Sequence, residues 1–233
     1  MCSFLQIYNE KIYDLLQDRV ANPLSIREDK LAGLYVEGLT EYIVTNVADC
    51  FMLLKRGERN RITRHTKNNI SSSRSHSIFQ LIVETDEVDK RGMLKRAKLN
   101  LCDLAGSEKL DKSETIGKAH LSELKNINLS LTTLGKVISC LAKASENFMG
   151  NKKAPAPFIP YRESKITRLL QDSLGGNTVT CLIATVSPIL NNLDETMSTL
   201  KFADRAKEIM FKVSANEINA NDDALVSRLR SEI

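Results

Sequence analysis

Two polar segments carry residue types that can bind a metal ion and phosphate. In the first, four hydroxyls, a guanidinium and an imidazole occupy consecutive positions just before an apolar run, Ser71-Ser72-Ser73-Arg74-Ser75-His76. Hydroxyl oxygens are hard ligands that Mg²⁺ accepts, and hydroxyl groups also donate hydrogen bonds to phosphate oxygens. Composition alone gives about equal weight to such a site and to a polar turn that caps a strand.

The second segment is an apolar run that ends in an acid. Leu99 to Cys102 is followed by Asp103, and Gly106 comes three residues later. An acid at the tip of a buried strand can hold a water on Mg²⁺, and a nearby glycine lets a backbone N–H approach a terminal phosphate. This arrangement recurs in nucleotide hydrolases, although a strand-ending Asp before a Gly turn is also common by itself.

The elements that must position these segments alternate between strands and helices. We expect strands at residues 4–8, 34–36, 42–44, 77–84, 98–102 and 180–187, the last of them buried on both faces. We expect a short helix or turn at 11–17, a helix after an N-cap at Asn46, and helices at 121–142, 162–174 and 194–210. A charged connection at 86–96 and a loop at 144–160 separate some of them. This order predicts a layered α/β domain whose ligands bind beyond strand ends.

Length and composition indicate one globular, intracellular domain. The 233 residues carry a net charge of +4, with 27% charged and 42% hydrophobic residues, which argues against a disordered chain. No apolar run is long enough to span a bilayer, and no signal-peptide pattern is present, so we expect no membrane partner. The five widely spaced cysteines are expected to be reduced core thiols.

Two basic clusters suit a polyanionic partner or form a solvated face. Residues 55–67 hold six basic side chains against Glu58, and residues 152–168 hold five against Glu163. Nucleic acid is the least favoured partner, because the chain has 5% aromatic residues and no Trp to stack on bases. We therefore expect no nucleic-acid partner.

Six motifs, in order, resemble the kinesin motor domain. They are Tyr8-Asn9-Glu10 with Tyr13-Asp14-Leu15-Leu16, Asn69 to His76 (switch I), Asp103 to Glu108 (switch II), Asn126-Ile127-Asn128 with Ser130-Leu131, Pro160-Tyr161-Arg162 with Ser164-Lys165, and Leu170 to Asn177. The resemblance implies an α/β, layered kinesin-like P-loop NTPase fold with a central mixed sheet and its N-terminal part missing. It also implies a partial motor domain at 1–212, then a neck linker and the start of a neck coiled coil at 213–233.

The resemblance assigns roles to individual residues. Ser72 and Ser73 would line the γ-phosphate and Mg²⁺ site, with Ser73 as the metal ligand. Asp103 would hold the metal through water, and the Gly106 N–H would sense the γ-phosphate. Arg74 and Glu108 would form the salt bridge that closes the two switches. The implied cofactors are ATP and Mg²⁺, with ATP contacted by Asn69, Ser72, Ser73 and Gly106.

The implied partner is the microtubule. The 121–142 helix would lie on tubulin, together with Lys109, Lys112, Asn128, Tyr161, Arg162, Lys165 and Arg168. Residues 209–216 would be the neck linker, whose docking converts nucleotide state into displacement. The family further implies a location in the cytoplasm on the microtubule cytoskeleton, and a homodimer formed through a coiled coil beyond residue 233.

One motif of the family is absent from the sequence. The phosphate-binding loop GxxxxGK[ST], whose amides and Lys cradle the phosphates, occurs nowhere in the 233 residues. The family is a microtubule-stimulated ATPase, but we expect no appreciable ATP turnover by these residues alone. Strand edges and apolar helix surface should also be exposed. The alternative function is a non-catalytic microtubule-binding module derived from a kinesin.

Overall fold

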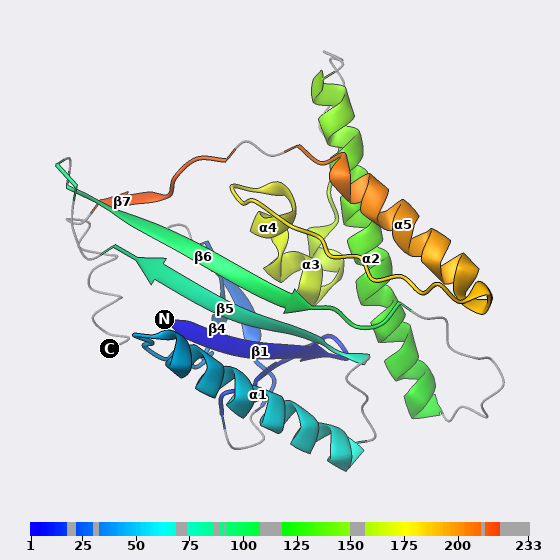
Figure 1. Ribbon diagram of the computed structural model, residues 1–233, viewed down its shortest axis with the longest axis horizontal. Coiled ribbons are helices and arrows are strands. Elements are labelled where there is room, and N and C mark those ends of the chain that lie inside the picture. Colours follow the sequence, from blue (N-terminus) through cyan, green and yellow to red (C-terminus); the bar gives the residue numbers. More distant parts are fainter. Residues whose placement is uncertain are drawn as a thin grey trace.

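The fold is a layered α/β arrangement around one twisted sheet (Figure 1). The computed structural model describes residues 1–17, 22–29, 33–68, 74–85, 89–90, 92–107, 118–149, 157–210 and 213–219. Its strands are β1 Cys2–Tyr8, β2 Lys11–Asp14, β3 Ser25–Asp29, β4 Gly33–Glu37, β5 His76–Glu84, β6 Met93–Asp103 and β7 Glu217–Asn219. Its helices are α1 Val47–Asn68, α2 Lys118–Met149, α3 Lys165–Leu169, α4 Gln171–Gly175 and α5 Leu193–Lys207, with 3₁₀ turns η2 Tyr161–Glu163 and η3 Leu190–Asn192.

Five strands form the main sheet in the order β2-β1-β5-β6-β7, and β3 and β4 form a separate hairpin. Every described pair of strands is antiparallel. The expected pairing of 77–84 with 98–102 is confirmed, but β6 begins at Met93, inside the segment expected to be a connection. The sheet therefore extends further than the apolar residues alone indicate.

Side chains of the central strands point alternately to the two faces of the sheet and pack into two separate hydrophobic cores. On one face, Leu5 and Ile78 pack with α2, α3 and α4 through residues such as Leu134 and Ile166. On the other face, Phe4 and Phe79 pack edge to face, at 5.4 Å between ring centroids, beneath Leu53 of α1. α1 thus covers one face of the sheet and the remaining helices cover the other (Figure 1).

The expected helix or turn at 11–17 is wrong, because residues 11–14 form strand β2. Asn9 and Glu10 both have positive φ, 52° and 56°, which is the conformation of a type I′ hairpin turn. The turn folds Ile12 back onto β1, where its side chain is fully buried. Asp14 ends the strand by accepting the backbone N–H groups of Leu16 and Thr40.

The region between Leu24 and Val44 is only partly as expected. Residues 34–36 do form a strand, within β4, but its partner is β3, which the sequence did not indicate. The expected strand at 42–44 is reduced to a single bridge between Tyr42 and Cys2. The apolar pattern at 42–44 therefore marks a contact with the sheet edge and no full strand.

α1 begins as expected and lies very close to the sheet. The Asn46 side-chain oxygen accepts the Asp49 N–H at 3.0 Å, which confirms the N-cap. At Gly57, an added Cβ would lie only 2.1 Å from Cδ1 of Phe4. Glycine at this position is therefore required by the distance between helix and sheet.

The helices on the other face differ from expectation in length and continuity. α2 continues to Met149, so it occupies the first residues of the loop expected at 144–160. The single helix expected at 162–174 is divided into η2, α3 and α4, because Ser164 is extended and Leu170 leaves helical geometry. The predicted stop is confirmed, since α4 ends at Gly175. α5 occupies most of the helix expected at 194–210 and lies beside α2 (Figure 1).

The strand expected at 180–187 is extended chain that pairs with no described strand. Its apolar side chains face solvent instead of a core, and Ile183 is 84% exposed. The cysteine expectation is also only partly right, because all five thiols are free but Cys102 and Cys181 are exposed. Apolar side chains of this segment and of β6, such as Ile183, Leu99 and Leu101, are therefore exposed, although their composition predicts burial against other apolar side chains.

Candidate functional site

The described ends of the two polar segments lie where β5 begins and β6 ends. Because these strands are antiparallel, Ser77 lies opposite Asp103. Figure 1 shows the start of β5 beside the end of β6, so the chain that enters β5 and the chain that leaves β6 are at the same end of the sheet. The described ends of both segments are therefore neighbours in space.

Several predicted site residues lie outside the described residues, namely Asn69, Ser72, Ser73, Glu108, Lys109 and Lys112. The Arg74–Glu108 salt bridge and the Ser73 metal ligand consequently stay predictions. Arg74 is half-buried just before β5, and Gly106 is half-buried in the turn after β6.

Asp103 is held by an arginine that comes from α1. Its Oδ2 accepts a hydrogen bond from Nη1 of Arg61 at 2.8 Å, and the arginine side chain is 11% exposed against 68% for the aspartate. The same guanidinium donates to Ser77 Oγ and to the Ser75 carbonyl oxygen, both at 3.2 Å. Arg61 thus joins α1 to the start of β5 and the end of β6, and it orients the exposed carboxylate.

The sequence placed Arg61 among basic residues offered to a polyanion, and the structure corrects this. Leu53 and Gly57 are buried on the inner face of α1, and Arg61 follows Gly57 by four residues on that face. Lys55 and Arg59 are exposed on the outer side, while the side chains of Arg64 and Lys67 lie outside the described part. The four-residue spacing from Gly57 was the signal that could have identified Arg61.

His76 is a buried histidine that uses both ring nitrogens. The Ala105 N–H donates to Nδ1 at 3.0 Å, so Nδ1 carries no proton and Nε2–H donates to Ser130 Oγ at 2.8 Å. Burial lowers the pKa of His76 to about 4, with Asp103 opposing and Arg61 adding to the shift. His76 is therefore neutral at physiological pH, and it contacts both the turn after β6 and helix α2.

The residues expected to face tubulin form a second region on α2, η2 and α3. Asn128 and Arg162 are exposed, whereas Tyr161, Lys165 and Arg168 are half-buried. Lys152 and Lys153, from the same basic cluster, lie outside the described residues.

Acidic side chains partly neutralise this second cluster. Oε2 of Glu28, on β3, lies 3.2 Å from Nη2 of Arg162 and 4.0 Å from Nη2 of Arg168. Within the cluster, Oε2 of Glu163 pairs with Nζ of Lys136 at 3.1 Å. All these groups except Arg168 are about half or more exposed, so the pairs are weak and a partner can replace them.

Glu10 fixes the start of α3, a role that the sequence did not indicate. Its two carboxylate oxygens accept the Ser164 hydroxyl at 2.8 Å and the Lys165 N–H at 2.7 Å. A carboxylate at a helix N-terminus is favourable because it meets unpaired N–H groups and the positive end of the helix dipole. The β1–β2 turn therefore positions the helix that bears Lys165 and Arg168.

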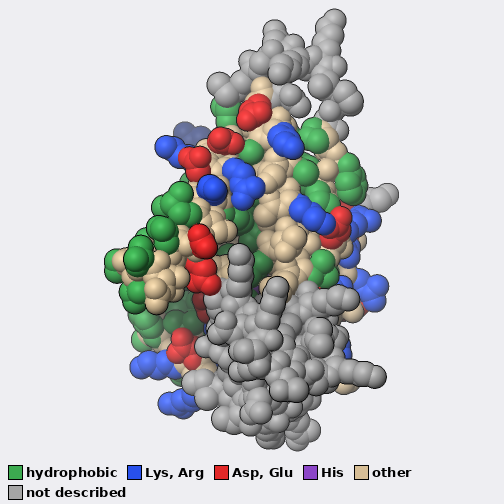
Figure 2. Space-filling view, turned by 90° about the vertical axis from the view of Figure 1, so that its right-hand side faces the viewer, with side chains coloured by type: hydrophobic (Ala, Val, Ile, Leu, Met, Phe, Trp, Pro, Cys, Tyr) green, Lys and Arg blue, Asp and Glu red, His purple; other side chains and the backbone are tan. Residues whose placement is uncertain are grey.

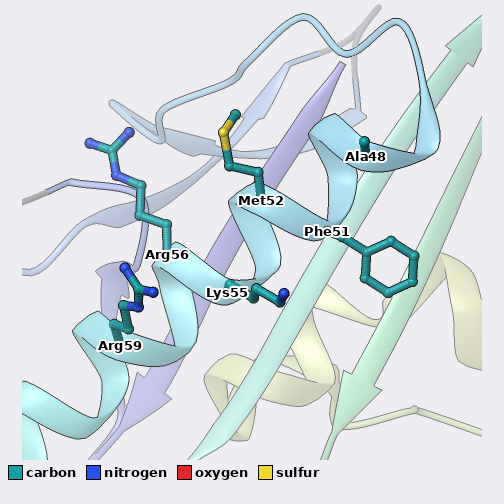
Figure 3. Close-up of a pocket in the computed structure, with 6 residues that line it drawn as sticks. All are labelled: Ala48, Phe51, Met52, Lys55, Arg56 and Arg59. Carbon is teal, nitrogen blue, oxygen red and sulfur yellow. The ribbon is translucent and has the colours of Figure 1, made fainter.

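The outer face of α1 carries a separate, shallow hollow. Ala48, Phe51, Met52, Lys55, Arg56 and Arg59 line it, and Figure 3 shows these side chains projecting from one helix. Phe51 and Met52 are largely exposed there. Arg56 instead turns to Tyr42, with its guanidinium 5.6 Å from the ring centroid. This surface combines apolar and basic groups.

Charge is mixed on the end of the molecule that Figure 2 shows. Lys and Arg side chains there are interspersed with Asp, Glu and hydrophobic side chains, without a continuous patch of one sign in the coloured part of that view (Figure 2). Among the helices of the described residues, none has the length and apolar character needed to cross a bilayer.

These features define a layered α/β protein in which the described ends of two polar segments lie at the start of β5 and the end of β6, with basic side chains on η2 and α3. The family model for the kinesin motor domain matches residues 1–209. The chain belongs to the kinesin motor domain family, and the expected layered, kinesin-like α/β fold is confirmed. The described strands of its sheet are all antiparallel, in place of the mixed sheet that was expected.

Sequence relatives and solved structures agree with this assignment. Kinesin-related protein 5 of Dictyostelium discoideum is 48% identical over 216 residues, which are 93% of this chain and 20% of the relative. Kinesin-like protein KIN-5A of Arabidopsis thaliana is 43% identical over 241 aligned positions, covering 99% of this chain and 22% of the relative. The chain thus spans about a fifth of the length of these two relatives.

Two solved structures share the fold. One is a KIF14 dimer in a two-heads-bound state with AMP-PNP in complex with a microtubule, at a TM-score of 0.78 and 40% identity, covering 98% of this chain and 62% of that one. The other is a fast kinesin, at a TM-score of 0.79 and 41% identity, covering 95% of this chain and 59% of that one.

Proposed function

We propose that the chain is part of a microtubule-based motor that binds and moves on microtubules in an ATP-dependent way. The observation that carries the proposal is the pairing of Ser77, at the start of β5, with Asp103, at the end of β6, in a chain of the kinesin family. We propose a location on the microtubule cytoskeleton in the cytoplasm.

The nucleotide site is proposed where β5 begins and β6 ends. The exposed carboxylate of Asp103 is a hard oxygen ligand of the kind that holds Mg²⁺ through water, so the donor chemistry fits. Ser73 would complete the metal site, Asn69 and Ser72 would contact ATP, and Glu108 would pair with Arg74. Bound Mg²⁺ would supply charge neutralisation at the transferring phosphate. Arg61 would hold Asp103 in place, and the Gly106 N–H would face the phosphate.

We propose further that these residues alone do not turn over ATP. Without GxxxxGK[ST] in the 233 residues, no phosphate cradle of that type supports the triphosphate. Beyond Arg96, the edge of β6 that faces β7 pairs with no described strand, and the 180–187 segment, Phe51 and Met52 are exposed. These features support the need for a further polypeptide segment beside them. An ATPase assay of the 233-residue chain should give no microtubule-stimulated turnover; turnover at ordinary motor rates would contradict this proposal.

The tubulin surface is proposed on α2, η2 and α3, with Lys109 and Lys112 preceding α2. In a co-sedimentation assay, replacing both Arg162 and Lys165 by Ala should weaken microtubule binding about tenfold or more at low salt. The reason is that the double variant lacks two positive charges that attract an acidic partner surface. The matched control replaces Lys55 and Arg59 of α1 by Ala. Equal loss in both double variants would show that total charge, and not this surface, determines binding.

The alternative function is a non-catalytic microtubule-binding module, which the missing phosphate loop favours. Co-sedimentation with and without ATP separates the two. Release of the chain by ATP supports the motor, whereas binding that ignores ATP supports the module.

Residues 1–212 are proposed as the partial motor domain and 213–233 as the neck linker and the start of a coiled coil that forms a homodimer. In support, the Asn177 side chain exchanges two hydrogen bonds with the backbone of Ser214, at 2.7 and 2.8 Å. β7 then pairs with the start of β6. Residues 220–233, with the predicted coiled-coil positions Leu225, Leu229 and Ile233, lie outside the described residues.

A further inference from the structure

His76 connects two parts of the molecule that the proposed function uses separately. Its Nδ1 accepts the Ala105 N–H from the turn after β6, and its Nε2 binds Ser130 Oγ of α2. His76, Ala105 and Ser130 are all buried, at 3%, 6% and 2% exposure. Water therefore has little access to replace either hydrogen bond.

Near Ser130, α2 has one exposed face and one face buried against His76. Residues two apart in an α-helix lie about 200° apart around its axis, so Asn128 and Ser130 occupy nearly opposite faces. Asn128 is exposed, while Ser130 meets the imidazole. A shift of α2 caused by a partner at Asn128 would therefore act directly on Ser130 and His76.

We propose that His76 is a positioning residue that couples the Ala105–Gly106 turn to α2 through Ser130. The proposal rests on the proposed function in one respect: it takes Gly106 to be near the phosphate and Asn128 to be near tubulin. The imidazole is rigid and planar, so its two nitrogens keep a fixed separation. If the turn or α2 moves alone, a buried polar group loses its partner, and for this reason the two move together.

Amide hydrogen exchange on the 233-residue chain tests the coupling without nucleotide. Ser130→Ala removes the α2 contact and leaves the imidazole less firmly held, so exchange at Ala105 and Gly106 should become about three- to tenfold faster, as expected for loss of one buried hydrogen bond. The matched control is Ser139→Ala in the same helix, where the hydroxyl donates to the carbonyl oxygen of Gly135. It should leave exchange at Ala105 within about twofold.

His76→Asn provides a second, independent variant. The Asn side-chain oxygen can occupy the place of Nδ1 and accept from Ala105, but it cannot reach Ser130. This variant should therefore resemble Ser130→Ala, and the double variant should exchange no faster than either single one. Unchanged exchange at Ala105 in Ser130→Ala, or additive effects in the double variant, would overturn the proposal.

The same measurement on microtubules separates this proposal from the proposed function. Microtubules should slow exchange at Ala105 in the unmodified chain and have little effect on it in Ser130→Ala. If the chain does not co-sediment but Ser130→Ala still speeds exchange, the proposed function fails and the coupling stands. If it co-sediments and Ser130→Ala leaves Ala105 unchanged, the coupling fails.

Discussion

The ion pair between Arg61 and Asp103 joins one buried and one exposed group. The exposed carboxylate can hydrate when the pair is broken, whereas the arginine site is enclosed by Ser75 and Ser77. Removing the guanidinium should therefore cost more than breaking a surface pair, because the groups around it lose their donor.

Arg61→Gln should lower the free energy of unfolding by about 1–3 kcal/mol, measured by denaturant titration. The control Lys55→Gln, on the exposed face of the same helix, should change it by less than about 0.5 kcal/mol. Equal effects would mean that Arg61 contributes no more than a surface charge.

His76 makes stability depend on pH. Its pKa is about 4 when folded and near 6.5 when unfolded, so the unfolded chain binds the proton more readily. This contribution is complete above pH 6.5 and is lost as the pH falls towards 4. Between pH 7 and pH 5 the unfolding free energy should fall by about 2 kcal/mol on this account. His76→Gln should remove that part of the slope and leave any due to the other two histidines.

Among individual residues, the sequence predicts those at the ends of the strands that form the candidate site. It does not predict the role of residues that contact the site or its helices from other elements. Asp103 and Gly106 were identifiable because an apolar run stops at an acid before a glycine. Glu10 was not identifiable, and for Arg61 the spacing from Gly57 indicates only an inward-facing side chain, since each residue acts on a distant segment through the tertiary fold.

At the scale of elements, α3 depends on a carboxylate from the β1–β2 turn. Glu10→Ala removes the acceptors of Ser164 and Lys165, and should lower the free energy of unfolding by about 1–2 kcal/mol and speed exchange of the Lys165 amide. Glu37→Ala, which removes only an exposed pair with Arg27, should cost less than about 0.5 kcal/mol. A similar loss in both variants would contradict the capping role.

Element types were easier to predict than their boundaries and partners. The apolar stripe of α2 predicts a helix, but polar residues extend it to Met149. The buried strand expected from the apolar run at 180–187 is wrong, because strand pairing needs a neighbour that an apolar run does not reveal. The break at Ser164 was hidden because Glu10, from another element, fixes it.

At the scale of the whole molecule, apolar surface is left uncovered beside the sheet. Leu99 and Leu101 on β6 are about half exposed, and Ile183 is almost fully exposed. Such surface favours association between copies when nothing else covers it.

Ile183→Lys should reduce concentration-dependent light scattering of the 233-residue chain, with the free energy of unfolding unchanged within about 0.5 kcal/mol. Asn191→Lys adds the same charge on exposed chain without removing an apolar group, and should have a smaller effect. Equal reductions would show that net charge alone controls the association.

Because Gly57 lies against the Phe4 ring, a substitution at position 57 can disturb the Arg61–Asp103 ion pair indirectly. Any larger residue must lift α1 from the sheet, and Arg61 lies one helical turn further along the same face, about 6 Å away. A mutational survey would score changes at position 57 as packing defects. Their first chemical effect, however, would be the loss of the Arg61 counter-ion from Asp103 at the end of β6.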